Sequence, residues 1–290
     1  MNGEAGGRIT YLIANCNRSA WLPDCLASLL AQTSAAWLAL IVDDASTDDS
    51  LAVVAAVPDP RIRLLRNERN LGYIASLERL LEEAATDIVA VLDPDDALAP
   101  EATETLLRTY AAQPDAAFVY SRFASYDERL AGCRAVHGGA IPPRGTALCD
   151  GPVGAIRSFR RSAYRRTAGL DPGMLYAEDR DLVYKLEEVT SPIFLDAVLY
   201  RYRELPDSQS RDPEKRAVGV RNTRRARRAA LRRRNVRGVR RVLWEAWVWG
   251  DFVASSDRWS RPVRRLAAGV AAGSLRLLRA FSPAAADGSR

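Results

Sequence analysis

Two aspartates, Asp93 and Asp95, stand on either side of a proline directly after the apolar segment 87–92. Two carboxylates on one turn suit a hard divalent cation that keeps several water ligands and binds a diphosphate. Aspartates at strand ends also cap turns through their own backbone, and for an isolated pair this structural role is the favoured interpretation. The choice between the two therefore depends on the surrounding elements.

The first half of the chain alternates strand-like and helix-like segments, which predicts a mainly parallel α/β sheet with helices on both faces. Expected strands are 8–14, 38–42, 61–66, 87–92, 117–120 and 193–203, and expected helices are 20–32, 50–56, 73–85, 100–112 and 178–189. Ligands of such sheets lie beyond the carboxyl ends of the strands. Polar residues from three strand ends should converge there: Asn15, Cys16, Asn17, Asp43, Asp44, Asp93, Asp95 and Asp96.

In this context the sequence resembles the family 2 inverting glycosyltransferases, which have the GT-A nucleotide-sugar-binding fold. The matching segments are 13–18 with 21–33, 41–48, Asn70-Leu71-Gly72 with 92–96, and 177–182. They follow one another in the family's order and extend over about residues 8–211. The resemblance implies a metal-dependent transfer from a nucleotide-diphosphate sugar to a hydroxyl acceptor, a glycan or a lipid-linked envelope saccharide.

The resemblance also implies roles on the donor side. Asp44 would accept a hydrogen bond from the base, and Asp93 and Asp95 would hold Mn²⁺ or Mg²⁺, which neutralises the leaving diphosphate. A UDP-sugar is the expected donor, with dTDP- and GDP-sugars as alternatives. The other expected nucleotide-sugar-binding residues are Ala14, Cys16, Asn17, Asn70, Gly72 and Arg203.

On the acceptor side, the resemblance makes Asp179 the general base, with Glu178 as the second candidate. A base is needed because a sugar hydroxyl is a poor nucleophile until its proton is being removed. The alternative is an ordinary helix start, where acidic residues favour the positive end of the dipole. Phe159 and Arg160 are expected to line the acceptor side, with a surface basic turn as the alternative.

Two positions depart from the family pattern. Cys16 stands where a ring usually stacks on the base, and Leu205 stands where a histidine ligand is common. Arg201 and Arg203 are therefore candidates for neutralising phosphate charge. His137, the single histidine, is expected in a solvated loop.

Composition fits a folded enzyme. With 48% apolar and 27% charged residues in a chain of 290, a disordered or fibrous protein is excluded. Four cysteines without Cys-x-x-Cys spacing indicate free thiols in a reducing cytoplasm. Neither a secretory signal nor an apolar run of 18 residues is visible, so a cytoplasmic location is expected. Residues 1–211 are expected to form the catalytic domain, with a donor half at about 8–120 and an acceptor half at about 121–211.

Residues 212–290 are expected to form a basic α-helical extension, with helices at 213–234, 236–255 and 260–281. From Arg211 onward there are 21 Lys+Arg and 6 Asp+Glu, a net charge of +15. Arginines beside a Trp-rich face fit a helix on an anionic membrane surface. The alternative is that these helices pack on the catalytic domain. Nucleic-acid binding ranks last, because no recognised module accompanies the arginines.

Two further functions remain open from the sequence. One is a non-catalytic nucleotide- or glycan-binding module on the same fold, which the departures at Cys16 and Leu205 would suit. The other is a basic, membrane-associated scaffold that works through residues 212–290.

Overall fold

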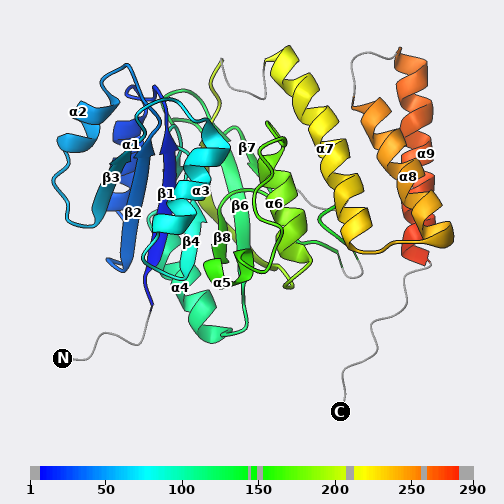
Figure 1. The fold of residues 1–290 in the computed structure, drawn as a ribbon, viewed down its shortest axis with the longest axis horizontal. Coiled ribbons are helices and arrows are strands. Elements are labelled where there is room, and N and C mark those ends of the chain that lie inside the picture. The colour runs from blue at the N-terminus through cyan, green and yellow to red at the C-terminus, as the bar shows by residue number, and fades with distance from the viewer. Residues whose placement is uncertain (1–6, 143–144, 149–152, 207–211, 256–259, 281–290) are drawn as a thin grey trace. The chain divides into compact units, whose positions relative to one another are not determined.

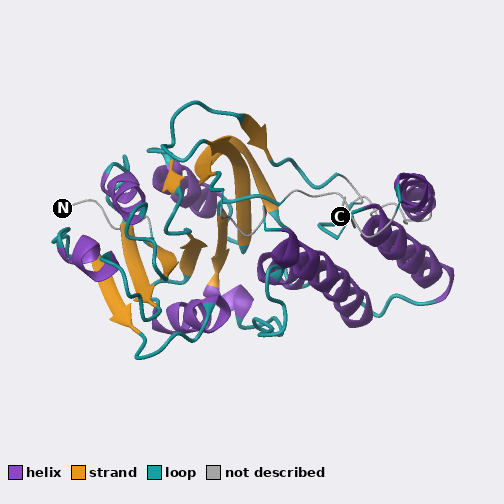
Figure 2. Cartoon of the chain, turned by 90° about the horizontal axis from the view of Figure 1, so that it is seen from above, coloured by secondary structure: helices purple, strands orange, loops and turns teal. Residues whose placement is uncertain are grey.

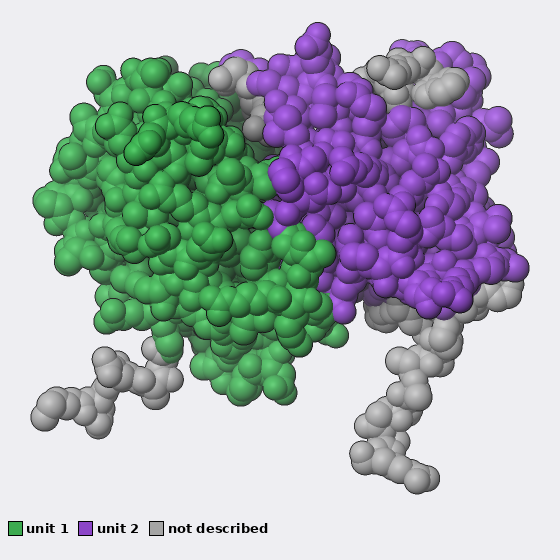
Figure 3. Space-filling view, in the orientation of Figure 1, with its two compact units in different colours: residues 1–140, 151–169, 189–205 green, residues 141–150, 170–188, 206–290 purple. Residues whose placement is uncertain are grey.

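The computed structural model describes residues 7–142, 145–148, 153–206, 212–255 and 260–280. The chain divides into two compact units (Figure 3). Unit 1 comprises Met1–Ala140, Gly151–Gly169 and Val189–Leu205, and unit 2 comprises Ile141–Asp150, Leu170–Glu188 and Pro206–Arg290.

Unit 1 contains one sheet of nine strands, in the order β3-β2-β1-β4-β8-β6-β9-β5, with β7 paired to β6 (Figure 1). Neighbours among the first four are parallel, as are β6 and β9, whereas β8, β5 and β7 pair antiparallel with their neighbours. The prediction of a mainly parallel sheet is thus confirmed. The strands are β1 (Ile9–Asn15), β2 (Trp37–Asp43), β3 (Ile62–Arg66), β4 (Ile88–Val91), β5 (Ala97–Leu98), β6 (Phe118–Tyr126), β7 (Ala135–His137), β8 (Arg157–Arg160) and β9 (Ile193–Arg203).

Helices cover both faces of this sheet, as expected (Figure 2). Successive side chains of a strand point to opposite faces. Ile9, Tyr11 and Ile13 of β1 pack in one core with buried residues of α1 (Leu22–Leu30), α2 (Ser50–Ala55) and α4 (Ala102–Ala112). α3 (Tyr73–Glu83) packs on β1 and β2 with side chains outside that core, and it contacts Arg161 of the short helix α5 (Arg161–Tyr164).

Three short strands, β5, β7 and β8, are absent from the sequence prediction. They have two to four residues each and show no clear alternation of apolar and polar residues, so periodicity could not reveal them. His137 belongs to β7 and not to a loop, although its side chain is exposed as expected. Its Nε2 lies 3.2 Å from Ser125 Oγ.

Unit 2 contains the helices α6 (Glu178–Glu187), α7 (Pro213–Arg233), α8 (Gly238–Ala254) and α9 (Arg261–Ala280). Asp212 caps α7, because its side chain accepts hydrogen bonds from the amides of Glu214 and Lys215. A Cβ on Gly250 of α8 would lie 2.5 Å from the carbonyl oxygen of Ala267 in α9. Glycine therefore permits the close approach of these two helices.

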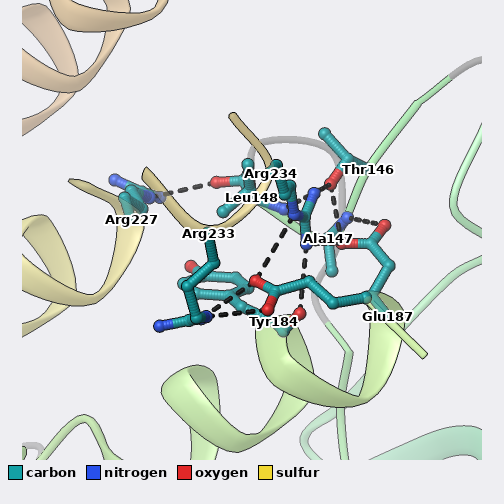
Figure 4. A network of polar contacts seen from close by, with 9 residues as sticks. Thr146, Ala147, Leu148, Tyr184, Glu187, Arg227, Arg233 and Arg234 are labelled. Atoms are coloured by element: carbon teal, nitrogen blue, oxygen red, sulfur yellow. Dashed lines mark hydrogen bonds and ion pairs between the residues drawn. The ribbon is translucent and has the colours of Figure 1, made fainter. Parts of the chain in front are cut away.

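Arginines at the end of α7 hold other segments of unit 2 (Figure 4). The guanidinium of Arg234 donates to Glu187 Oε2 at 2.7 Å, to Thr146 Oγ1 at 2.9 Å and to the carbonyl of Tyr184 at 3.1 Å. Arg233 forms a two-point pair with Glu188, at 2.7 and 2.9 Å. Part of the basic extension, residues 212–290, thus packs α7 against α6 within unit 2.

Candidate functional site

The loops after β1 and β2 are joined by side-chain hydrogen bonds. Asn15 Nδ2 donates to Asp43 Oδ1 at 3.1 Å, and Asn17 Oδ1 accepts from the amide of Thr47 at 2.8 Å. Ala14 pairs with Val42 in the sheet directly before these residues. The expected convergence of the β1 and β2 ends is therefore present in unit 1.

Asp44 holds the loop that leads into α3. Its carboxylate accepts from Asn67 Nδ2 at 2.7 Å and from the amides of Leu71 and Gly72, each at 2.8 Å. Gly72 has a φ of +86°, which L side chains rarely adopt, so glycine is required for this amide to face the carboxylate. A carboxylate has about four acceptor positions, which leaves room for one further donor such as a base N–H.

Replacing Asp44 by alanine should destabilise unit 1 by about 2–4 kcal/mol. Three donors would lose this acceptor, and a buried polar group without a partner costs about 1–3 kcal/mol. The Asn67 amide group and the Gly72 amide would keep one acceptor each, Ser76 Oγ and Asn70 Oδ1. Urea unfolding measures the loss, and Asp44→Asn, which keeps one carbonyl oxygen, should lose less. An alanine variant as stable as the original chain would show that the loop does not depend on this carboxylate.

Cys16 faces the same loop, since its Sγ accepts from Asn70 Nδ2 at 3.3 Å. Partial burial, followed by the charges of Asp44 and Asp43, raises the pKa of the Cys16 thiol, which therefore stays neutral at pH 7. Five of the expected nucleotide-binding residues are thus brought together by the ends of β1 and β2 and by the start of α3: Cys16, Asn17, Asp44, Asn70 and Gly72.

Asp93 lies between two tyrosines that the sequence did not single out. Tyr73 Oη is 3.5 Å from Asp93 Oδ1, and Tyr200 Oη is 3.4 Å from Asp93 Oδ2. Tyr200 Oη also accepts from the Asp93 amide at 3.1 Å. Because Tyr200 is fully buried, burial raises its pKa well above the usual range, and it remains a neutral hydroxyl beside the carboxylate.

Asp95 forms an ion pair with a further unforeseen residue, Arg18, at 3.4 Å from Nε to Oδ2. Both side chains are partly exposed, at 28% for Arg18 and 23% for Asp95. Arg18 lies in the loop after β1, inside a segment that matched the family pattern, but residue type alone gave it no role. Its position places a permanent cation next to the carboxylate expected to hold the metal.

Arg203 is buried beneath this turn. Its amide donates to Asp96 Oδ1 at 2.7 Å, its Nε to the carbonyl of Asp95 at 2.6 Å, and its Nη2 to Asp24 Oδ2 at 2.8 Å. The guanidinium also donates to the carbonyl of Glu128. Arg203 thus supports the turn from below, and the phosphate role implied by the resemblance stays a prediction.

Asp96 is the most buried carboxyl of the turn, with 1% exposed. Burial, followed by the charges of Asp95 and Asp93, raises its pKa well above the usual range. Leu205, which stands at the family's histidine position, is 1% exposed.

The carboxylates of this turn suit a cation that takes some of its ligands from the protein and the others from a bound substrate. No cluster of three or more His, Cys, Asp or Glu suited to a metal occurs among the described residues. Asp93 and Asp95 nevertheless offer carboxylate oxygens on one turn, and Mg²⁺ is commonly bound by one or two carboxylates plus substrate phosphates. These two side chains would therefore hold Mn²⁺ or Mg²⁺ together with a bound diphosphate.

The expected acceptor-side residues fall into different units. Glu178 and Asp179 form the first turn of α6 in unit 2, where Asp179 Oδ1 accepts from the Arg180 amide at 2.7 Å. Phe159 is fully buried in β8 of unit 1, and Arg160 donates to the carbonyl of Ala116 at 2.9 Å. Phe159 and Arg160 therefore have structural roles in unit 1, and their acceptor role stays a prediction.

Comparisons with known proteins identify the family of this chain. A family model described as Glycosyl transferase family 2 matches residues 10–168. The protein named "Putative glycosyltransferase EpsE" of Bacillus subtilis is 31% identical over 223 residues, which cover 73% of this chain and 77% of that protein. The O-antigen biosynthesis protein RfbC of Myxococcus xanthus is 31% identical over 192 residues, 64% of this chain but 15% of RfbC.

Solved structures share the fold at low sequence identity. S. aureus TarS 1-349 in complex with UDP-GlcNAc has a TM-score of 0.61 and 15% identity, with 94% of this chain and 89% of that chain covered. Mannosyltransferase PcManGT from Pyrobaculum calidifontis, in complex with GDP-Man and Mn²⁺, has a TM-score of 0.59 and 18% identity, with coverage of 96% and 85%. At this identity the likeness shows the fold.

Proposed function

The chain belongs to glycosyl transferase family 2 and is a glycosyltransferase of the GT-A fold that uses nucleotide sugars, and on that premise we propose an inverting, metal-dependent transfer to a hydroxyl acceptor. The observation that carries the proposal is the position of three carboxylates at one edge of the parallel sheet, with Asp44 directly after β2 and Asp93 and Asp95 soon after β4. Parallel sheets bind their ligands at this edge.

Donor binding follows from the contacts at this edge. Asp44 has an acceptor position left for the base, and Cys16 and Asn70 lie beside it. Bound between Asp93, Asp95 and the diphosphate, Mn²⁺ or Mg²⁺ would act as a Lewis acid for the leaving group. Arg18 would add a positive charge beside Asp95, and Tyr73 and Tyr200 would orient the Asp93 carboxylate.

Asp179 is the proposed general base, with Glu178 as the second candidate. The acceptor hydroxyl would give its proton to the carboxylate while its oxygen forms a bond to the anomeric carbon. The bond from that carbon to the diphosphate oxygen breaks, and the nucleoside diphosphate leaves with the electron pair. Attack from the opposite face inverts the anomeric configuration.

The proposed acceptor is a glycan or a lipid-linked saccharide of the cell envelope. Two relatives support it by name, RfbC of O-antigen biosynthesis and ExoO of succinoglycan biosynthesis in Rhizobium meliloti. ExoO is 36% identical over 93 residues, 32% of this chain and 27% of that protein. A UDP-sugar is the first donor to test, and dTDP- and GDP-sugars follow. We propose further that residues 1–211 form the catalytic part of the chain and that residues 212–290 form an extension.

Release of nucleoside diphosphate from a panel of nucleotide sugars, with Mn²⁺ or Mg²⁺ added, tests the proposal. Turnover that stops with a chelator supports the metal-dependent transferase. A nucleotide sugar that binds without turnover, even with acceptor glycans present, would favour the non-catalytic module. That second candidate rests on Cys16 and on the buried Leu205, which replace a ring and a metal ligand of the family pattern.

We also propose that α9 rests on the anionic inner face of the membrane, which places the enzyme at the cytoplasmic surface. Within the described part of the chain, no helix is long and apolar enough to cross a bilayer. The sequence of α9 contains arginines and no Asp or Glu. The positive charge and the exposed apolar area of α9 together suit binding to the negatively charged cytoplasmic leaflet of the membrane. Its exposed apolar residues share one helical stripe: Val263, Leu266, Val270 and Leu277.

Leu266→Glu should weaken binding of the full-length protein to vesicles of phosphatidylcholine and phosphatidylglycerol by about tenfold or more. Leu266 is 70% exposed, and burying a leucine contributes about 1.5–3 kcal/mol. Ala268→Glu, an exposed position of α9 outside the stripe, makes the same charge change and should have a smaller effect in vesicle sedimentation. Equal binding by the original chain and Leu266→Glu would contradict membrane docking through this stripe.

A further inference from the structure

One face of α7 lines a pocket of about 320 Å³ in unit 2. Ligand pockets commonly measure about 300–1,000 Å³, so this volume suits a small group and not a whole sugar nucleotide. Residues three or four positions apart share one face of a helix, which explains why one stripe of α7 supplies nearly the whole lining. The lining consists of Arg221, Arg224, Arg225, Arg228 and Arg232 of α7 and Phe252 of α8.

The positive charge of this pocket is only partly compensated. Arg225 pairs with Asp171 at 3.3 Å, and Arg228 pairs with Glu245 at 2.8 Å. Glu245 also receives Arg241, at 2.5 Å, so its charge is shared. Among the residues that the structure describes, no carboxylate pairs with the remaining three arginines of the lining, Arg221, Arg224 and Arg232.

Arg224 occupies the most constrained position. Its guanidinium carbon lies 4.7 Å from the centroid of the Phe252 ring, and its Nε is buried without a hydrogen-bond acceptor in the described part of the chain. Burial, followed by the charge of Arg228, lowers the pKa of the Arg224 guanidinium. Both observations indicate that the Arg224 guanidinium lies among other positive charges. An anion whose oxygens only accept hydrogen bonds would stabilise its charged form.

We propose that this pocket binds a diphosphate group. The lining side chains are donors or an apolar ring, whereas phosphate oxygens are acceptors, and the planar guanidinium forms two parallel hydrogen bonds to such oxygens. The three arginines that form no ion pair with a described carboxylate match a group that carries two to three negative charges better than they match a single carboxylate. All six lining residues belong to unit 2, whereas the residues proposed to bind the donor belong to unit 1.

Calorimetric titration of the full-length protein with inorganic pyrophosphate, with EDTA present, tests this site apart from any metal-dependent donor binding. Arg224→Gln should weaken pyrophosphate binding at least tenfold, and so should Arg221→Gln, whose exposed side chain can be exchanged without loss of the fold. Arg240→Gln, an exposed arginine of α8 outside the pocket, is the matched control for net charge and should bind as the original chain does. Equal affinities in Arg221→Gln, Arg224→Gln and Arg240→Gln would overturn the proposal.

Two further titrations identify the source of the diphosphate. UDP in EDTA tests a soluble nucleotide, and phosphatidylcholine vesicles that carry a polyprenyl diphosphate test a lipid headgroup. A loss of UDP affinity confined to the two pocket variants assigns the pocket to a soluble diphosphate, and a loss of vesicle binding confined to them assigns it to a lipid. Pocket variants that match Arg240→Gln in both titrations would count against a diphosphate site here, whatever the transferase activity is.

Discussion

Replacing Asp95 by asparagine is expected to lower sugar transfer by about 10²–10⁴-fold or more, because a metal-bound leaving group is stabilised by several kcal/mol. The change removes one negative ligand and keeps the shape of the side chain. Its effect on the free energy of unfolding should stay below about 1 kcal/mol, since the Arg18–Asp95 pair is partly exposed and such pairs contribute little.

The measurement is initial rate with the cognate donor over a range of Mn²⁺ or Mg²⁺ concentrations, together with urea unfolding. Asp115→Asn, at an exposed position between α4 and β6, provides the same chemical change away from the site and should leave both quantities unaltered. Near-native transfer by Asp95→Asn at low metal concentration would remove Asp95 from the metal site.

Asp179→Asn should lower kcat by about 10²–10⁴-fold, the usual loss when a general base is removed, while the Kd of the donor changes little. Asparagine cannot take the proton of the acceptor hydroxyl. Single-turnover rates and donor titration separate the two effects. If donor affinity falls together with kcat, Asp179 belongs to the nucleotide site or to the fold.

Two variants distinguish this base from an ordinary acidic helix start. Glu178→Gln should lose much less activity than Asp179→Asn, and the reverse order would identify Glu178 as the base. Glu214→Gln replaces an acid in the first turn of α7, where a dipole contribution of about 0.3–1 kcal/mol is the expected role. An Asp179→Asn variant that behaves like Glu214→Gln, with slightly lower stability and full activity, would leave Asp179 as a helix-start residue.

The sequence predicted the edge of the sheet at which the candidate site residues lie. Parallel strands place their carboxyl ends at one edge, so Asp44 and Asp93 could be brought together by pattern alone. The partners of these carboxylates could not be predicted in the same way. Tyr200 reaches Asp93 across 107 residues. Such contacts depend on strand order and register, which apolar periodicity does not contain.

The partners of the arginines could not be predicted from the sequence either. In the sequence, Arg203 is a candidate for neutralising phosphate charge, and Arg234 is one of the arginines of the basic extension 212–290. In the structure, Arg203 donates to the backbone of the Asp95 turn, and Arg234 binds Glu187 of α6. A guanidinium offers five donors in a fixed plane, so it can serve carbonyl groups, carboxylates and phosphates alike. Residue type therefore indicates the chemistry of an arginine but not its partner.

The interleaving of the two units has a consequence for the order in which the newly made chain can fold. The chain passes between the units five times, and its final part, from Pro206, belongs to unit 2. Unit 1 has all its strands once β9 leaves the ribosome. Glu187 of unit 2 can form its ion pair only after Arg234 has been synthesised, 47 residues later. At about 5–20 residues per second this delay is roughly 2–10 s. During that interval α6, which carries Glu178 and Asp179, lacks the arginine contacts of α7, so we expect this part of the enzyme to reach its native packing later than unit 1.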